Sequence, residues 1–244
     1  MTRWRTDEQH DGFRQRLFTV AVQRRKVPGV LWTPIGDDGT PRPLVLIGHG
    51  GAGHKLDDSR LDLAARYTRR GLAAAAIDGP WHGERSPAAG AARESYAAHA
   101  VDAMVADWRA TLDALAALPE IDGERVGYGG VSMGTVFGLP FAAADLRVRA
   151  TALGLCGLRA ANGAPLEMAP RLARDARALT APVLFLLQWD DDVFERAGSL
   201  ELFDLIGASD KRLIANVGRH HETPEHTRAA STAFLVDQLT AARG

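Results

Sequence analysis

A short glycine-flanked serine segment constrains the fold of this chain more than any other stretch. Residues 126–135 read VGYGGVSMGT, so that Ser132 is the centre of a G-x-S-x-G motif with apolar residues before and after it. This order predicts a buried strand, a sharp turn and a helix, with small residues where side chains would collide with backbone. The turn would hold the hydroxyl at the N-terminus of the helix, where free N–H groups favour negative charge. Ser132 is therefore a candidate nucleophile.

The motif alone leaves alternatives open. The chain contains 25 glycines, so that such a pattern can arise by chance. An ordinary glycine-rich loop is one alternative, and a phosphate-binding turn is another. The segment lacks the Lys-Ser/Thr pair of a P-loop and the G-x-G-x-x-G spacing of a dinucleotide-binding turn. The rest of the chain has to separate these interpretations.

Length and composition narrow the class of protein. The 244 residues, 46% hydrophobic and 24% charged, predict one globular domain over 1–244, with 1–16 as a polar N-terminal extension. A net charge of −1 argues against a nucleic-acid partner. Cys156 is the single cysteine, which excludes an internal disulfide and suits a reducing compartment. No run approaches the ~20 apolar residues of a membrane span or resembles a signal peptide. We therefore expect a cytoplasmic enzyme with no membrane partner.

Strand-like and helix-like segments alternate along the chain. Expected strands are residues 17–23, 27–33, 44–47, 72–77, 125–129, 150–155, 183–187 and 212–216. Expected helices are residues 56–70, 94–118, 133–144, 172–179, 194–206 and 225–242. This alternation predicts an α/β protein with a mostly parallel sheet covered on both faces and right-handed crossovers. Functional residues in such sheets lie at the carboxyl ends of the strands, so we expect them in the loops there.

The loop after residue 47 reads GHGGAGH, a small-residue segment directly after a buried strand. Small residues let backbone N–H groups approach a ligand, and acyl transfer needs such donors where an oxyanion forms. We expect an oxyanion hole from the N–H of Gly51, with Ala52 as the alternative, and that of Met133. A glycine-rich turn without a ligand is the other explanation. His49 fits a structural hydrogen-bonding role better than that of a base.

The loop after residue 77 reads DGPWHGER, and it ends a strand at the same edge of the sheet. Trp81 is a candidate wall of the pocket. His82 is a weaker candidate base, because nearby carboxylates would equally explain a structural role.

Two later loops supply an acid and a base. Residues 190–192 are three consecutive aspartates after a strand, which suits the acid of a triad, and their mutual repulsion argues that they point in different directions. We favour Asp191, with Asp192 second. His220 follows the last strand and is our candidate base, with His221 as the alternative. Surface histidines ahead of a helix are the bland explanation, and a zinc site that also used His226 would match no known ligand spacing.

The chain order of nucleophile, acid and base resembles that of the α/β-hydrolases. Within them, the GVSMG motif, the HGG segment and the DGPWHG turn look like those of dienelactone hydrolase-related esterases. The resemblance covers residues 40–242 and implies a three-layer αβα sandwich with roughly eight strands and no large cap domain. Two features depart from the family: dienelactone hydrolases proper use cysteine where this chain has Ser132, and Trp189 stands near a position where many relatives have glycine.

The resemblance implies a two-step acyl transfer by Ser132, His220 and Asp191, with no metal or organic cofactor. We expect small to medium carboxylic esters as substrates and leave a homodimer open. Residues 157–180 are too few for a large cap, so the site should be fairly open. The expected apolar wall, whose members would otherwise be ordinary core, is Trp81, Leu158, Met168 and Phe194. The alternatives are a thioesterase, a peptidase, a non-catalytic binding protein, or a nucleotide-binding protein that uses residues 48–53.

Overall fold

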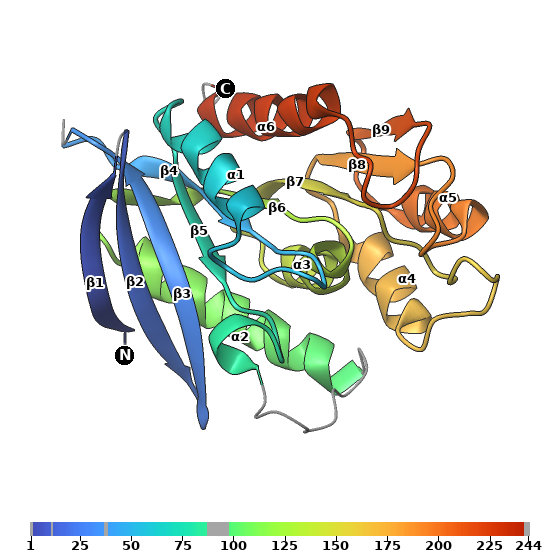
Figure 1. Ribbon diagram of the computed structural model, residues 1–244, viewed down its shortest axis with the longest axis horizontal. Coiled ribbons are helices and arrows are strands. Elements are labelled where there is room, and N and C mark those ends of the chain that lie inside the picture. The colour runs from blue at the N-terminus through green and yellow to red at the C-terminus, as the bar shows by residue number, and fades with distance from the viewer. Residues whose placement is uncertain (1, 11, 37–38, 87–97, 242–244) are drawn as a thin grey trace.

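One mixed sheet runs through the molecule. The computed structural model describes residues 2–241 except 11, 37–38 and 87–97. Within these residues the sheet has nine strands in the order β1-β2-β3-β5-β4-β6-β7-β8-β9 (Figure 1). The strands are β1 (Thr2–His10), β2 (Phe13–Val22), β3 (Arg25–Pro34), β4 (Arg42–Ile47), β5 (Ala73–Ile77), β6 (Ile121–Gly129), β7 (Val148–Gly154), β8 (Val183–Gln188) and β9 (Lys211–Asn216). From β5 to β9 all pairings are parallel, whereas β1, β2 and β3 form an antiparallel meander.

Helices cover both faces of the sheet. Their bounds are α1 (Asp58–Thr68), α2 (Ala98–Ala116), α3 (Met133–Ala144), α4 (Ala169–Ala178), α5 (Arg196–Leu205) and α6 (Glu225–Thr240). Tyr67 of α1 and Leu235 of α6 belong to the apolar core on one face. Trp108 of α2 and Phe137 of α3 belong to the core on the other face, together with side chains of α4 and α5. The predicted mostly parallel sheet between two helical layers is confirmed, and the described residues include no large cap domain (Figure 1).

The strand β1 lies in the segment that the sequence analysis leaves as an N-terminal extension. It pairs with β2 along its length and has a register shift between Trp4 and Thr6. Most of its side chains are exposed, so it carries none of the apolar alternation that marks a buried strand. Charged side chains are common on edge strands, because they discourage pairing with other chains. The sheet consequently has one strand more than the sequence predicts.

Three further observations concern helix α2, strand β3 and the apolar character of the helices. The expected helix at 94–118 corresponds to α2, and residues 94–97 lie outside the described residues. Strand β3 continues through Pro28 and Gly29, and the side chain of Phe18 on β2 occupies the space where a side chain on Gly29 would be. No helix in the described ranges combines the length and the apolar character needed to span a membrane.

Candidate active site

Ser132 sits in a strained turn between β6 and α3. Its backbone has φ 56° and ψ −122°, a left-handed conformation that side chains other than glycine rarely adopt. Its N–H donates to the carbonyl of Gly154 at 2.9 Å, which ties the turn to the end of β7. Side chains on Gly130 and Gly134 would come within 3.1 Å of neighbouring atoms, among them the Gly48 carbonyl oxygen. The two glycines of the motif therefore permit the turn that exposes the serine at the edge of the sheet.

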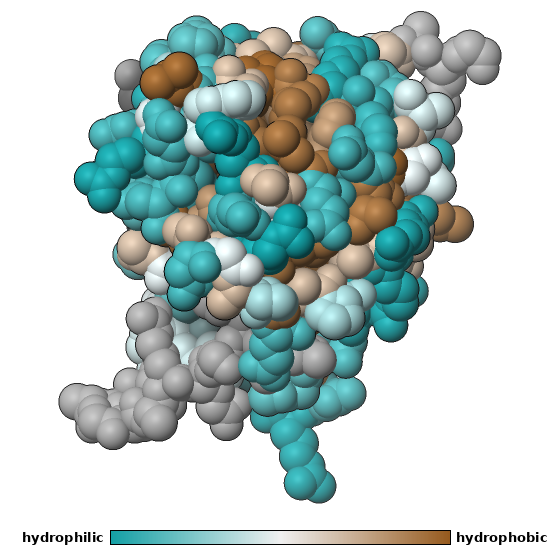
Figure 2. Space-filling view, turned by 90° about the vertical axis from the view of Figure 1, so that its right-hand side faces the viewer, coloured by the Kyte–Doolittle hydropathy of each residue, from teal (hydrophilic) through white to brown (hydrophobic). Residues whose placement is uncertain are grey.

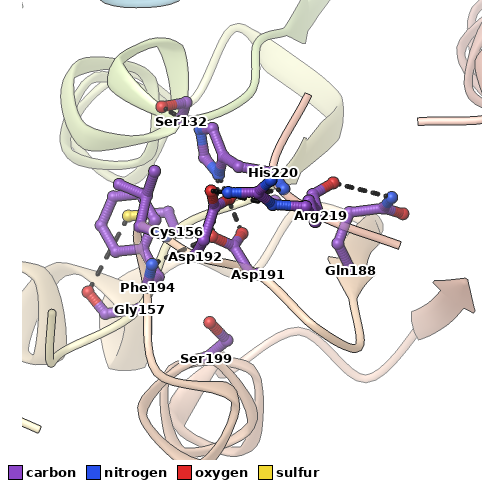
Figure 3. A network of polar contacts seen from close by, with 12 residues as sticks. Ser132, Cys156, Gly157, Gln188, Asp191, Asp192, Phe194, Ser199, Arg219 and His220 are labelled. Carbon is purple, nitrogen blue, oxygen red and sulfur yellow. Dashed lines mark hydrogen bonds and ion pairs between the residues drawn. The ribbon is translucent and has the colours of Figure 1, made fainter. Parts of the chain in front are cut away.

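His220 and Asp191 meet at this serine (Figure 3). The Nε2 atom of His220 lies 3.0 Å from Ser132 Oγ, and its Nδ1 atom lies 2.8 and 3.0 Å from the two carboxylate oxygens of Asp191. His220 comes from the loop after β9 and is only 3% exposed, while Asp191 comes from the loop after β8. The structure thus brings together three side chains that are up to 88 residues apart in the sequence.

Asp191 is held as an acceptor. One of its oxygens also accepts the backbone N–H groups of Val193 at 2.8 Å and Phe194 at 3.0 Å. Burial acts to raise the pKa of Asp191, but the hydrogen bonds from His220 and from these two N–H groups outweigh it and hold the pKa below its usual value. The carboxylate therefore stays charged beside the imidazole, where it favours a proton on Nδ1.

Asp192 and His221, the alternative acid and base, make different contacts. Asp192 accepts the backbone N–H of His220 at 3.2 Å and pairs with the guanidinium of Arg219, so it contacts the histidine loop and not the ring. His221 packs edge-on against His220, with the ring centroids 4.9 Å apart. Of the pairs that the sequence left open, Asp191 and His220 are the two whose side chains lie in line with Ser132 Oγ.

Backbone N–H groups without an acceptor occur in the loop after β4 and at the start of α3. The N–H groups of Gly51, Ala52 and Met133 have no hydrogen-bond acceptor among the described residues. Gly51 and Ala52 line the same cavity as Ser132, and Met133 is the first residue of α3. Free N–H groups at a helix N-terminus and in a tight turn are suited to an anion.

Two buried histidines support the turn that carries Gly51. His49 accepts the N–H of Gly79 on Nε2 at 2.8 Å, so the proton lies on Nδ1, which donates to the Gly50 carbonyl at 2.8 Å. Burial lowers the pKa of His49 to about 4 and keeps it neutral. The Nε2 atom of His82 lies 2.8 Å from the Gly51 carbonyl oxygen. Since both rings contact backbone away from the serine, their geometry is structural, as the sequence favoured for His49.

A cavity of about 800 Å³ opens beside Ser132, between α1 and α6. Its apolar lining is Leu63, Tyr67, Val131, Ala152, Leu155 and Leu186. Its charged lining is Asp57, Asp58, Arg60, Asp62, Glu225 and Arg228. Figure 2 views the molecule from the end toward which β8 points, where apolar surface is framed by hydrophilic side chains. The cavity therefore joins an apolar interior to a polar, charged rim.

The four side chains that were expected to form an apolar wall of the pocket lie on the other side of the sheet from this cavity. Leu158, Met168 and Phe194 are buried members of the core under α4 and α5, and Trp81 packs against that core. None of the four lines the cavity. Their side chains fill the α4 and α5 side of the sheet, whereas this cavity lies on the α1 and α6 side, so a substrate-binding role for them stays a prediction. No cluster of three or more metal-binding side chains occurs in the part of the chain that the structure describes.

Comparison with solved structures places the chain beside esterases. A cold-adapted esterase from an Arctic intertidal metagenomic library, solved as a PEG-bound complex, is 36% identical over 98% of this chain and 100% of that chain, with a TM-score of 0.85. An acetyl xylan esterase from Paenibacillus sp. R4 is 18% identical over 98% and 88% of the two chains, with a TM-score of 0.77, which shows a shared fold. No model of a protein family and no curated protein sequence matches the chain.

Proposed function

The chain belongs to the α/β-hydrolase superfamily of esterases, and on that premise we propose that it hydrolyses small to medium carboxylic esters through an acyl-enzyme on Ser132. The observation that carries the proposal is the continuous hydrogen-bonded line from Ser132 Oγ through His220 to Asp191. A serine at φ 56° beside free backbone N–H groups supports the same conclusion. The esterase that is 36% identical supports ester as the substrate class.

Acylation begins with proton transfer. His220 Nε2 removes the hydroxyl proton as Ser132 Oγ attacks the ester carbonyl carbon, and Asp191 stabilises the imidazolium that forms. The N–H groups of Gly51 and Met133 donate to the oxyanion of the tetrahedral intermediate. The C–O bond to the alcohol then breaks, and the leaving oxygen takes the proton from His220. The product of this half-reaction is an ester on Ser132.

Deacylation repeats the sequence with water. His220 removes a proton from a water molecule, which attacks the acyl carbon, and the same N–H groups stabilise the second oxyanion. Collapse of this intermediate returns the proton to Ser132 and releases the acid. Both half-reactions therefore use the same side chains and peptide groups, and water is the second nucleophile.

The cavity sets the expected size of the substrate. A volume of about 800 Å³ exceeds that of an acetyl group by far and lies within the ~300–1,000 Å³ of small-molecule sites. The apolar lining from α1 and from the ends of β7 and β8 suits an alkyl or aryl group. We therefore expect turnover of p-nitrophenyl esters from acetate upward, which a panel of graded chain lengths measures.

The test of the proposed nucleophile is Ser132→Ala. We expect turnover of p-nitrophenyl butyrate to fall by up to ~10⁶-fold, and labelling by a fluorophosphonate probe to disappear. The control is Ser199→Ala, because Ser199 is buried in α5 and lies outside the cavity. Retention of most activity in Ser132→Ala would rule out the proposal, as would a folded wild-type protein that hydrolyses no ester in the panel.

A further inference from the structure

The turn after β5 carries a buried histidine that the proposed reaction does not use. His82 is 6% exposed and does not line the cavity, so it cannot reach a substrate there. Its Nε2 atom lies 2.8 Å from the Gly51 carbonyl oxygen, and its Nδ1 atom lies 2.6 Å from the Pro80 carbonyl oxygen. Both carbonyl oxygens can only accept, and a neutral imidazole has one N–H, so it donates to one of them; in the tautomer with the proton on Nε2 it donates to Gly51. The contact joins the turn after β5 to the loop after β4.

The Gly51 carbonyl belongs to the same peptide group as the N–H of Ala52. None of the described peptide bonds is cis, and a trans peptide group directs its C=O and N–H to opposite sides. The carbonyl points inward, toward a histidine that the cavity does not touch. The N–H of Ala52 therefore points away from His82. Ala52 lines the cavity, and its N–H has no acceptor among the described residues.

The turn that carries His82 has a defined backbone conformation. Trp81, the residue before it, has φ 62°, a left-handed conformation that favours glycine and is strained in other residues. The N–H of His82 donates to the Gly79 carbonyl at 3.1 Å and closes the turn. A strained residue persists only where its surroundings determine its conformation, and this one directly precedes His82.

A buried ion pair fixes the same two segments to each other. The fully buried carboxylate of Asp78 accepts from the ammonium of Lys55 at 2.6 Å and from the backbone N–H of Lys55 at 3.0 Å. The N–H of Gly79 donates to His49 at 2.8 Å. Contacts at His49 and at Lys55 therefore join the loop after β4 to the turn after β5. The contact of His82 with Gly51 lies between them in the sequence of the first loop.

We infer that His82 is a positioning residue, which holds the Gly51–Ala52 peptide group so that the N–H of Ala52 is a further donor to the oxyanion. The inference rests on the proposed function, since an oxyanion forms only if Ser132 attacks an ester. Hydrogen bonding to the carbonyl also polarises the peptide group and strengthens its N–H as a donor. The interaction acts on the tetrahedral state and leaves the binding of the neutral ester largely unchanged.

Substitution of His82 by Gln or by Asn tests the contact with Gly51, because each side-chain amide occupies the place of a different ring nitrogen. In His82→Gln the side-chain amide nitrogen reaches the place of Nε2 and can donate to Gly51, whereas in His82→Asn it reaches only the place of Nδ1, beside Pro80. With p-nitrophenyl acetate we expect His82→Asn to lower kcat roughly 10- to 100-fold, with KM within about threefold of the wild type. His82→Gln should restore kcat to within about threefold of the wild type.

A boronic acid supplies a readout that a merely structural role would not move. Phenylboronic acid forms a tetrahedral anion on the serine, so its inhibition constant should rise in His82→Asn by the same factor as kcat falls. The control is His54→Asn, because His54 is exposed in the same loop and contacts neither Gly51 nor the cavity. Melting temperatures of all variants are measured beside the rates, and the control should keep the kcat of the wild type.

Three results would overturn the inference. The first is a wild-type kcat in His82→Asn. The second is an equal loss of kcat in the Asn and Gln variants, which would assign the effect to the fold. The third is a loss of kcat without a matching loss of boronic acid affinity. Each of these leaves the proposed nucleophile intact, because that proposal is tested by Ser132→Ala and by ester turnover of the wild type.

Discussion

At the scale of single residues, two neighbouring carboxylates hold different parts of one histidine. Asp191 contacts the Nδ1 atom of the His220 ring, whereas Asp192 accepts the backbone N–H of that residue. Asp192 also pairs with Arg219, and its side chain is 42% exposed. Repulsion between adjacent carboxylates favours this divergence, since both cannot occupy the same site without cost. The pair therefore fixes the ring and the loop separately.

This division predicts unequal effects of the same substitution. Asp191→Asn should lower kcat about 10⁴-fold, because an amide stabilises neither the imidazolium nor the tautomer that leaves Nε2 free to accept a proton. Asp192→Asn should stay within about tenfold of the wild type, because an amide oxygen still accepts the His220 N–H and the lost ion pair is exposed. Steady-state rates on one p-nitrophenyl ester measure both. A larger loss in Asp192→Asn would assign the acid to Asp192.

At the scale of elements, α1 supplies one wall of the cavity, and this wall predicts chain-length selectivity. Leu63→Trp should narrow the cavity and lower kcat/KM for p-nitrophenyl octanoate about tenfold or more, while activity on the acetate stays near that of the wild type. Leu61→Trp is the matched control, since Leu61 lies on the same helix but does not line the cavity. An equal loss on both esters, or the same change in the control, would contradict a substrate-binding role for this wall.

Sequence patterns predict elements with apolar periodicity and miss those without it. The bounds expected for α3 agree with the structure because the G-x-S-x-G motif marks its start. Strand β1 was missed because its mostly exposed residues have no apolar face. The loops that carry Ser132, Asp191 and His220 could be named from strand order alone. The side of the sheet that stays hollow could not, because it depends on how fully Leu158 and Phe194 pack, and no local pattern records that.

At the scale of the whole molecule, the buried imidazole of His49 connects two active-site loops and also makes the stability of the fold depend on pH. His49 is 2% exposed, and its Nε2 atom accepts the Gly79 N–H, so protonation would remove an acceptor and bury a charge. Its pKa of about 4 lies below the ~6.5 of an unfolded histidine. Between these values the unfolded chain binds the additional proton, so the free energy of unfolding falls as the pH is lowered.

The contribution of His49 is therefore complete above pH ~6.5 and is lost progressively as the pH falls toward the folded pKa. At pH 5 the loss amounts to about 2 kcal/mol for this group. Urea unfolding of the wild type and of His49→Gln at pH 7.5 and pH 5 measures it, and the loss between the two pH values should be about 2 kcal/mol smaller in the variant. Carboxylates with lowered pKa values, such as Asp191, titrate in both proteins and cancel in the comparison. An equal loss in the two proteins would mean that the buried imidazole does not couple folding to pH.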